Sequence, residues 1–123
     1  MGVVFVVFVG GVPMIPHDKE YEVIKSHELD VGATPTAIAT AGFTAAELAA
    51  ATRAVLSVHD GDVHYLYDGQ DPTDIFGVHM SEAQGPHVVW GTTHISNLKF
   101  IRDQGASTAR VTIILETVQG TAS

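Results

Sequence analysis

The sequence predicts a mainly β protein, an antiparallel β-sandwich or jelly-roll-like domain with one short helix and an apolar N-terminal arm. Runs rich in Val, Ile, Tyr and Phe recur at intervals of about ten residues, separated by Gly, Pro, Asp and Asn, as is typical of sandwiches and barrels. No alternation of strands with long helices occurs, which argues against a parallel α/β sheet. The 123 residues suit an arm of residues 1–13 followed by one domain of residues 14–123.

The individual elements follow from local patterns. Strands are expected at residues 20–25, 34–40, 52–59, 63–68, 75–80, 87–91 and 108–116, with a less regular segment at 94–102. In the 52–59 strand, Ala54, Leu56 and Val58 share one face. Asp60-Gly61-Asp62 then has the chemistry of a hairpin turn into the next strand.

One helix is expected, near residues 45–51. Thr44 is followed three residues later by Glu47, ahead of an alanine-rich run. This spacing is a capping box, in which each of the two side chains bonds the other residue's backbone N–H. We expect this helix to be the only one in the chain.

The N-terminal arm contains an uninterrupted apolar run of Val3, Val4, Phe5, Val6, Val7, Phe8 and Val9. It is shorter than the roughly 18 to 20 residues that span a membrane, and it lacks the basic region of a signal peptide. Val and Phe favour a strand, and a strand with two apolar faces needs cover on both. We therefore expect these residues to contact another subunit or to seal a sheet edge. The alternative is that Met14 is the natural start.

Charge and composition narrow the classes of partner. The net charge is −8, and the six Lys and Arg residues are dispersed along the sequence. Phosphate-tracking surfaces need clustered cations, so direct binding to nucleic acid is not expected, and no membrane contact is expected either. Only 16% of residues are charged against a typical ~25%, which favours burial of apolar surface against other proteins. The absence of cysteine excludes disulfides and thiolate chemistry.

The segment YLYDGQDPTDIFG, residues 65–77, admits two interpretations. Asp68, Asp71 and Asp74 are potential calcium ligands, but their spacing does not match an EF-hand loop and no Glu stands at its twelfth position. The residue types instead fit a structural turn. Asp68-Gly69 ends a strand, and Asp71 precedes Pro72, whose ring restricts the backbone.

Catalytic and metal residues are not evident. His59 and His64 flank the Asp60–Asp62 turn and would face each other across a hairpin, but two ligands do not make a zinc site. No nucleophile elbow and no phosphate-binding glycine loop occurs. We expect a protein that is not an enzyme and has no cofactor, metal site or catalytic residue.

From Ala51 to Glu116 the chain resembles a family of small β-rich structural proteins of tailed bacteriophages. The resemblance rests on ATRAVLSV (51–58), VHYLYDGQDPT (63–73), GVHM (77–80), an apolar strand ending at Gly91, ISNLKFIR (95–102) and TARVTIILE (108–116). The chain departs from the pattern at Phe76 and in the loop at residues 84–87. The resemblance implies a virion component, either head decoration (cement) or tail-associated. It would assemble in the host cytoplasm with copies of itself and a major capsid or tail protein.

A second resemblance concerns HYLYDGQDPT (64–73), which is similar to a hairpin of immunoglobulin-like modules attached to glycan-processing enzymes. It implies an alternative function, a module that binds a glycan or a host-surface ligand. Trp90, Tyr65 and Tyr67 would then form the binding platform. The competing interpretation of these aromatic residues is packing in the core.

Overall fold

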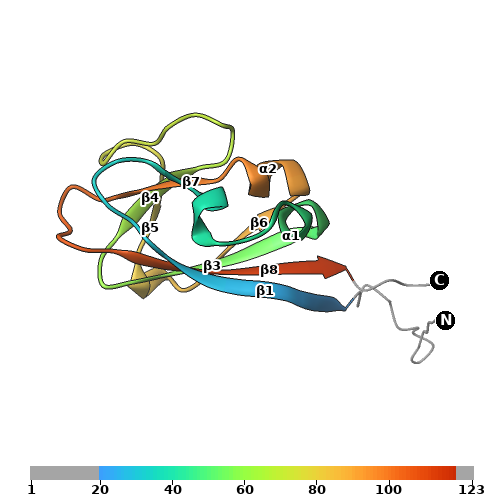
Figure 1. Ribbon diagram of the computed structural model, residues 1–123. Helices are drawn as coiled ribbons and strands as arrows, with labels where there is room; N and C mark the ends of the chain where they lie inside the picture. The colour runs from blue at the N-terminus through green and yellow to red at the C-terminus, as the bar shows by residue number, and fades with distance from the viewer. Residues whose placement is uncertain (1–19, 119–123) are drawn as a thin grey trace, which may run out of the picture.

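The computed structural model describes residues 20–118, which form two antiparallel four-stranded sheets (Figure 1). The first sheet has the order β1 (Tyr21–Asp30), β8 (Arg110–Val118), β3 (Arg53–His59), β6 (His87–Trp90). The second has the order β2 (Thr36–Ala37), β7 (Lys99–Arg102), β4 (Val63–Leu66), β5 (Val78–Met80). The predicted mainly β sandwich is confirmed, whereas the arm of residues 1–13 lies outside the described residues.

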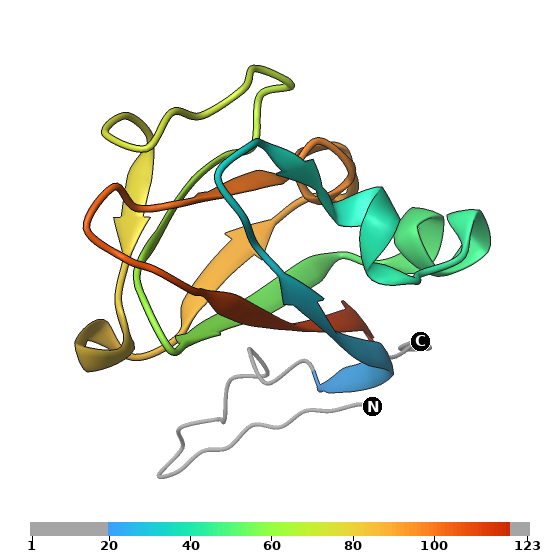
Figure 2. The same cartoon turned by 60° about the vertical axis from the view of Figure 1, so that its left-hand side comes forward.

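The strand pairs are nested within one another. β1 pairs with β8, β2 with β7, β3 with β6 and β4 with β5, and successive pairs alternate between the two sheets. A long antiparallel ribbon wrapped around a common core gives this order, which is the topology of a jelly roll. Figure 2 shows β5 running from the loop of residues 67–77 down to a short helix, from which the chain enters β6.

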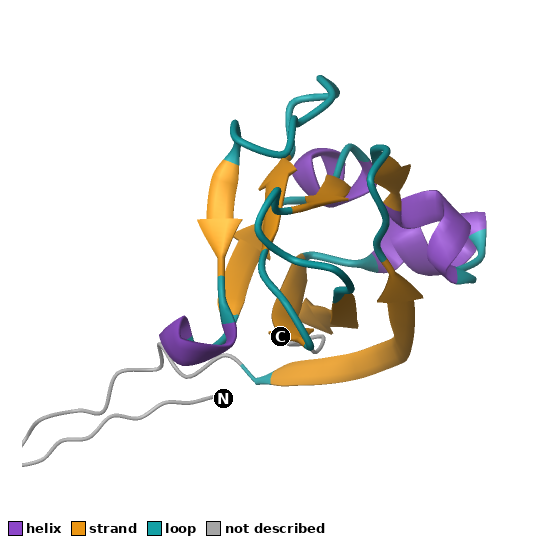
Figure 3. Ribbon diagram, turned by 90° about the vertical axis from the view of Figure 1, so that its left-hand side faces the viewer, coloured by secondary structure: helices purple, strands orange, loops and turns teal. Residues whose placement is uncertain are grey.

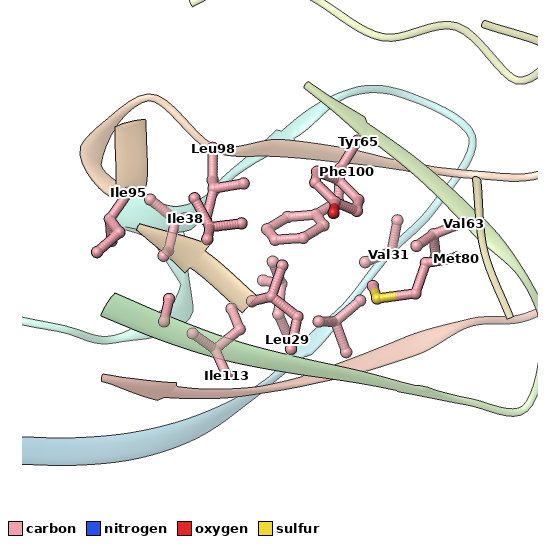
Figure 4. Close-up of a cluster of buried hydrophobic side chains, with 14 of the residues drawn as sticks. Leu29, Val31, Ile38, Val63, Tyr65, Met80, Ile95, Leu98, Phe100 and Ile113 are labelled. Atoms are coloured by element: carbon pink, nitrogen blue, oxygen red, sulfur yellow. The ribbon is translucent and has the colours of Figure 1, made fainter. Parts of the chain in front are cut away.

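The core lies between the sheets and is built from alternating residues. Ala54, Leu56 and Val58 of β3 point inward, as their spacing predicted, and β8 contributes inward residues in the same way. Phe100 of β7 is fully buried opposite them (Figure 4). The largest fully buried side chains are Phe100, Ile38, Leu56, Met80, Ile95, Leu98, Ile113, Leu115, Val63, Val111 and Pro72.

The predicted helix is present as α1 (Ala45–Ala50), and its capping box is formed. The backbone N–H of Glu47 donates to Thr44 Oγ1 at 3.0 Å, and the backbone N–H of Thr44 donates to Glu47 Oε1 at 2.9 Å. The prediction of a single helix was wrong. A second α-helix, α2 (Thr92–Ser96), lies within the described residues, together with the 3₁₀ helices η1 (Ile38–Ala41) and η2 (Glu82–Gln84).

Several strands have different limits from those expected. Of the strand expected at residues 34–40, only β2 (Thr36–Ala37) forms, and the 3₁₀ helix η1 (Ile38–Ala41) follows it. β1 continues to Asp30 because it pairs with β8 along its whole length, with a bulge between Val23 and Lys25. β5 begins at Val78 rather than at residue 75, so Ile75 and Phe76 belong to the loop before it. The limits of β1 and β5 depend on the partner strand, which the local pattern does not contain.

The predicted hairpin at Asp60-Gly61-Asp62 was wrong, although these residues do form a turn. β3 and β4 belong to different sheets, so the turn carries the chain across the sandwich. Asp60 has a positive φ of 67°, and a Cβ atom on Gly61 would lie 2.0 Å from the carbonyl oxygen of Thr108. The close approach of the two chains explains the glycine without a hairpin.

Candidate interaction surface

The outer strands β5 and β6 form one open side of the sandwich. β5 bonds only β4 in its sheet and β6 bonds only β3, as far as residues 20–118 show. Edge strands of natural proteins usually carry charges, prolines or bulges that prevent pairing with other chains. β6 has the sequence HVVW, which contains no Lys, Arg, Asp, Glu or Pro. It therefore has none of the usual sequence protection of an edge.

At alternate residues of β6, the backbone N–H and C=O groups point toward this open side. The Gly91 N–H donates to the Thr52 carbonyl at 2.9 Å, opposite β3. Bonded and non-bonded pairs alternate along an antiparallel ladder, so Val89 faces β3 while Val88 and Trp90 turn their backbone groups outward. The Trp90 carbonyl lies 3.1 Å from Nδ1 of His94. Among the described residues, the backbone groups of Val88 and the N–H of Trp90 remain available to an added strand.

An apolar groove of about 410 Å³ runs along this side. Its walls come from both sheets and from α2, and the lining residues are Tyr65, Tyr67, Val78, Val88, Val89, Trp90 and His94. Tyr67, Val78, Val88 and Trp90 are all exposed, and 54% of the Trp90 surface is accessible. Clusters of exposed apolar residues of this kind mark interaction sites more often than isolated ones do.

Trp90 also lies over the outer face of the first sheet. The Tyr21 and Trp90 rings meet edge-on, with their centroids 5.8 Å apart. The Arg53 guanidinium group lies 3.7 Å from the Tyr21 centroid and 5.4 Å from that of Trp90, and it forms an ion pair with Glu116. These contacts hold the exposed indole in place against the outer face of the sheet.

Tyr65 forms the floor of the groove. Only 4% of the residue is exposed, and its hydroxyl group lies 2.9 Å from Nδ1 of His87 on β6. Burial raises the pKa of the Tyr65 hydroxyl to about 12, with a smaller contribution from Tyr67. Of the three aromatic residues expected in a binding platform, Trp90 and Tyr67 are exposed while Tyr65 packs in the core. The structure brings all three to one groove.

The loop of residues 67–77 connects β4 to β5, and the chain bends at residues 67–69. Gly69 has a φ of 89°, and the Asp68 carboxylate accepts a hydrogen bond from the Gln70 N–H at 3.0 Å. Asp71 accepts a hydrogen bond from Lys99 Nζ at 2.9 Å, rather than one from the backbone ahead of it. Pro72, in the middle of this loop, is fully buried.

The tip of this loop is apolar, which the residue pattern did not predict. Ile75 is 68% exposed and Phe76 is 60% exposed. A short turn holds them, in which Thr73 and Phe76 exchange backbone hydrogen bonds of 2.9 and 3.1 Å. Figure 3 shows this loop standing out from the body of the sandwich. The tip is thus a second apolar feature on the same hairpin as Tyr67 and Val78.

The histidines are arranged differently from the prediction. His59 and His64 lie on strands of different sheets and do not face each other across a hairpin. His64 instead pairs with His79 across β4 and β5, with ring centroids 5.2 Å apart. The ring of His79 lies 3.0 Å from Asp62, and Nδ1 of His64 lies 3.4 Å from Asp103. Within residues 20–118, no group of three or more His, Cys, Asp or Glu is placed to hold a metal ion.

The described cations are mostly engaged by neighbouring acceptors. Lys99 pairs with Asp71, Arg110 pairs with Asp60 and Glu28, and Arg102 donates to the Ser107 carbonyl at 3.0 Å. Arg53 pairs with Glu116, so Lys99, Arg110 and Arg53 each have a carboxylate beside them. The surface that stands out in the described chain is therefore apolar rather than basic.

The seven candidate interface residues Val3, Val4, Phe5, Val6, Val7, Phe8 and Val9 lie outside the described residues. The open side of the sandwich was missed by the sequence reasoning, apart from its aromatic residues. The HVVW run of β6 carries no charge, but the sequence alone does not show that this strand lies at an edge.

No family model, curated protein or solved structure matches the chain. None of the helices described is long and apolar enough to cross a membrane.

Proposed function

We propose that the chain is a non-enzymatic structural component of a tailed-phage virion, a head decoration or tail-associated protein. It acts through contacts with copies of itself and with a major capsid or tail protein. The observation that carries this proposal is the uncharged open side between β5 and β6, with exposed Val78, Val88 and Trp90. An apolar edge of this kind is an aggregation hazard in a monomer and a binding surface in an assembly.

Three further points support assembly over catalysis. Jelly rolls are used repeatedly in viral capsids, although the fold alone does not decide a function. The net charge of −8 agrees with a position away from packaged DNA. The sequence resemblance over residues 51–116 points to the same class of protein.

Light scattering over a range of concentrations tests the self-assembly. The expected result is a species whose mass is a multiple of the 13.0 kDa chain. A 13.0 kDa monomer at every concentration would contradict self-assembly. Mass spectrometry of purified particles tests the location, and the chain is expected in stoichiometric amounts among the virion proteins.

A second candidate function is supported by the aromatic residues of the groove. Tyr67 and Trp90 are exposed there beside His94, and exposed aromatic rings suit the apolar faces of sugars. Jelly rolls also occur in lectins. In this case the chain is a monomer that binds a glycan, and adding the glycan changes the fluorescence of Trp90, the only tryptophan of the chain. Loss of binding in Trp90→Ala, with the fold intact, would separate this function from assembly.

A further inference from the structure

We infer that the open edge of β6 and the adjoining groove bind the apolar segment Val3–Val9 of another copy of this chain. The segment would add as an extra strand along β6 and place alternate side chains against Tyr67, Val78, Val88 and Trp90. This inference rests on the proposed function and extends it by naming the two surfaces that meet.

The receptor side has the two requirements for strand addition. Val88 and Trp90 turn backbone groups outward from β6, so main-chain hydrogen bonds to an added strand supply affinity. The groove beside them supplies apolar contacts from both sheets, through Val78 on β5 and Val88 on β6. A partner with a charged side chain every second residue would leave those charges against apolar walls, so the groove selects an apolar strand.

The segment Val3–Val9 has the matching chemistry. It consists of seven consecutive Val and Phe residues with no charge, and it spans roughly 23 Å in strand geometry. β6 has four residues and is therefore covered along its full length. Unlike an amphipathic strand, this one has two apolar faces. It gains from a position in which one face meets the groove and the other meets a neighbouring protein.

The start of the described fold favours a different copy as the donor. Tyr21 pairs with Val118, the last residue of β8, so the chain enters the first sheet at its end. β1 and β6 lie at opposite edges of this sheet, although the side chains of Tyr21 and Trp90 meet across its outer face. The ten residues between Val9 and Glu20 reach about 35 Å when extended, but reaching β6 of the same domain requires a reversal. Reaching a neighbouring copy beyond the end of the sheet requires none.

The test uses the absence of cysteine from the natural sequence. Full-length Val88→Cys is mixed with full-length Val6→Cys or Val7→Cys, whose side chains would point to opposite faces of a strand. A disulfide requires Cβ atoms about 4 Å apart, so a mixed disulfide forms efficiently only if the segment lies on β6. The expected result is a cross-linked pair, identified by peptide mapping, in several-fold excess over a control with Val23→Cys. Val23 is an exposed valine on β1 of the same sheet.

Three results would overturn the inference. Cross-linking no greater than with Val23→Cys, in a protein that light scattering shows to assemble, places the contact elsewhere and leaves the proposed function standing. A single chain that carries both Val88→Cys and Val6→Cys or Val7→Cys is the comparison. If the disulfide forms only within such a chain, the segment docks on its own domain. A chain that stays a monomer at every concentration removes the proposed self-assembly as well as this inference.

A second variant pair measures the effect on assembly. Val88→Lys places a charge at the edge of β6 and is expected to raise the concentration needed for assembly at least 10-fold. Val23→Lys is expected to leave it unchanged. Both positions are exposed, so thermal melting should show both variants folded. If both variants assembled at the same concentration, β6 would not be the strand that binds the segment Val3–Val9.

Discussion

The hydroxyl group of Tyr65 lies 2.9 Å from Nδ1 of His87, and this contact joins the two sheets beneath the apolar groove. Tyr65 belongs to β4 in the second sheet, whereas His87 begins β6 in the first. The rings also meet edge-on, with centroids 5.8 Å apart. The spacing of the open edges is thus fixed by a specific polar contact as well as by apolar packing.

Removing the hydroxyl group should weaken the fold. Tyr65→Phe keeps the ring and loses the hydrogen bond to His87, so the free energy of unfolding is expected to fall by about 1 kcal/mol. Urea denaturation measures this change. Tyr67→Phe, at an exposed ring, is the control and should stay within about 0.5 kcal/mol of the natural protein. Equal effects at the two positions would show that the Tyr65–His87 contact has no special role.

The raised pKa of Tyr65 leads us to expect a loss of folding stability at high pH. Burial raises the pKa of Tyr65 from 10.0 to about 12 in the folded state, so the folded protein holds this proton more tightly than the unfolded chain. The contribution of this protonated hydroxyl group to the free energy of unfolding is fully present below pH 10 and is lost as the pH rises through about 12. Tyr65→Phe should therefore show a flatter fall in stability over this range. A slope unchanged in Tyr65→Phe would exclude Tyr65 as its source.

Gly69→Val should destabilise the loop between β4 and β5. Gly69 has a φ of 89°, which a β-branched residue adopts only under strain, whereas a Cβ atom there would have open space around it. The expected cost is about 1–2 kcal/mol in chemical denaturation. Gly32→Val is the matched control, since a Cβ atom there also meets open space and the backbone is not in the left-handed region. If Gly69→Val were as stable as the natural protein, the positive φ at Gly69 would not be a source of strain for a β-branched residue.

Chelation is expected to leave the melting temperature unchanged. Asp68 is bonded to the Gln70 N–H and Asp71 to Lys99, so both carboxylates already serve the turn. Differential scanning fluorimetry with and without EDTA makes the comparison. A drop of several degrees, restored by calcium or zinc, would contradict the structural role of Asp68, Asp71 and Asp74.

The features that sequence reasoning predicted are those set by neighbouring residues. The capping box of α1 is complete within four residues, and the alternation in β3 needs only its own seven. The end of β4 likewise lies close to the local pair Asp68-Gly69, where Gly69 has a positive φ. In each case the signal and the structure that it specifies occupy the same short segment.

The features that it missed depend on distant parts of the chain. α2 contains Thr92, Thr93 and Ser96, which are poor helix formers, and forms where Ile95 packs into the core. The Asp60–Asp62 turn has hairpin chemistry, but nothing local determines which sheet the next strand joins. The apolar groove exists because β5 and β6 end as the outer strands of their sheets, which only the complete topology decides.

The nested order of the strands has a consequence for synthesis. β8 lies between β1 and β3 in the middle of the first sheet, yet it is the last of the described strands in the sequence. Its pairing with β1 joins residues that are 97 positions apart at Tyr21 and Val118 and 80 apart at Asp30 and Arg110. The contact order is therefore high, and folding is expected to be slow. Until residues 110–118 leave the ribosome, β1 and β3 lack the strand that lies between them. This nascent chain is therefore the state most exposed to aggregation.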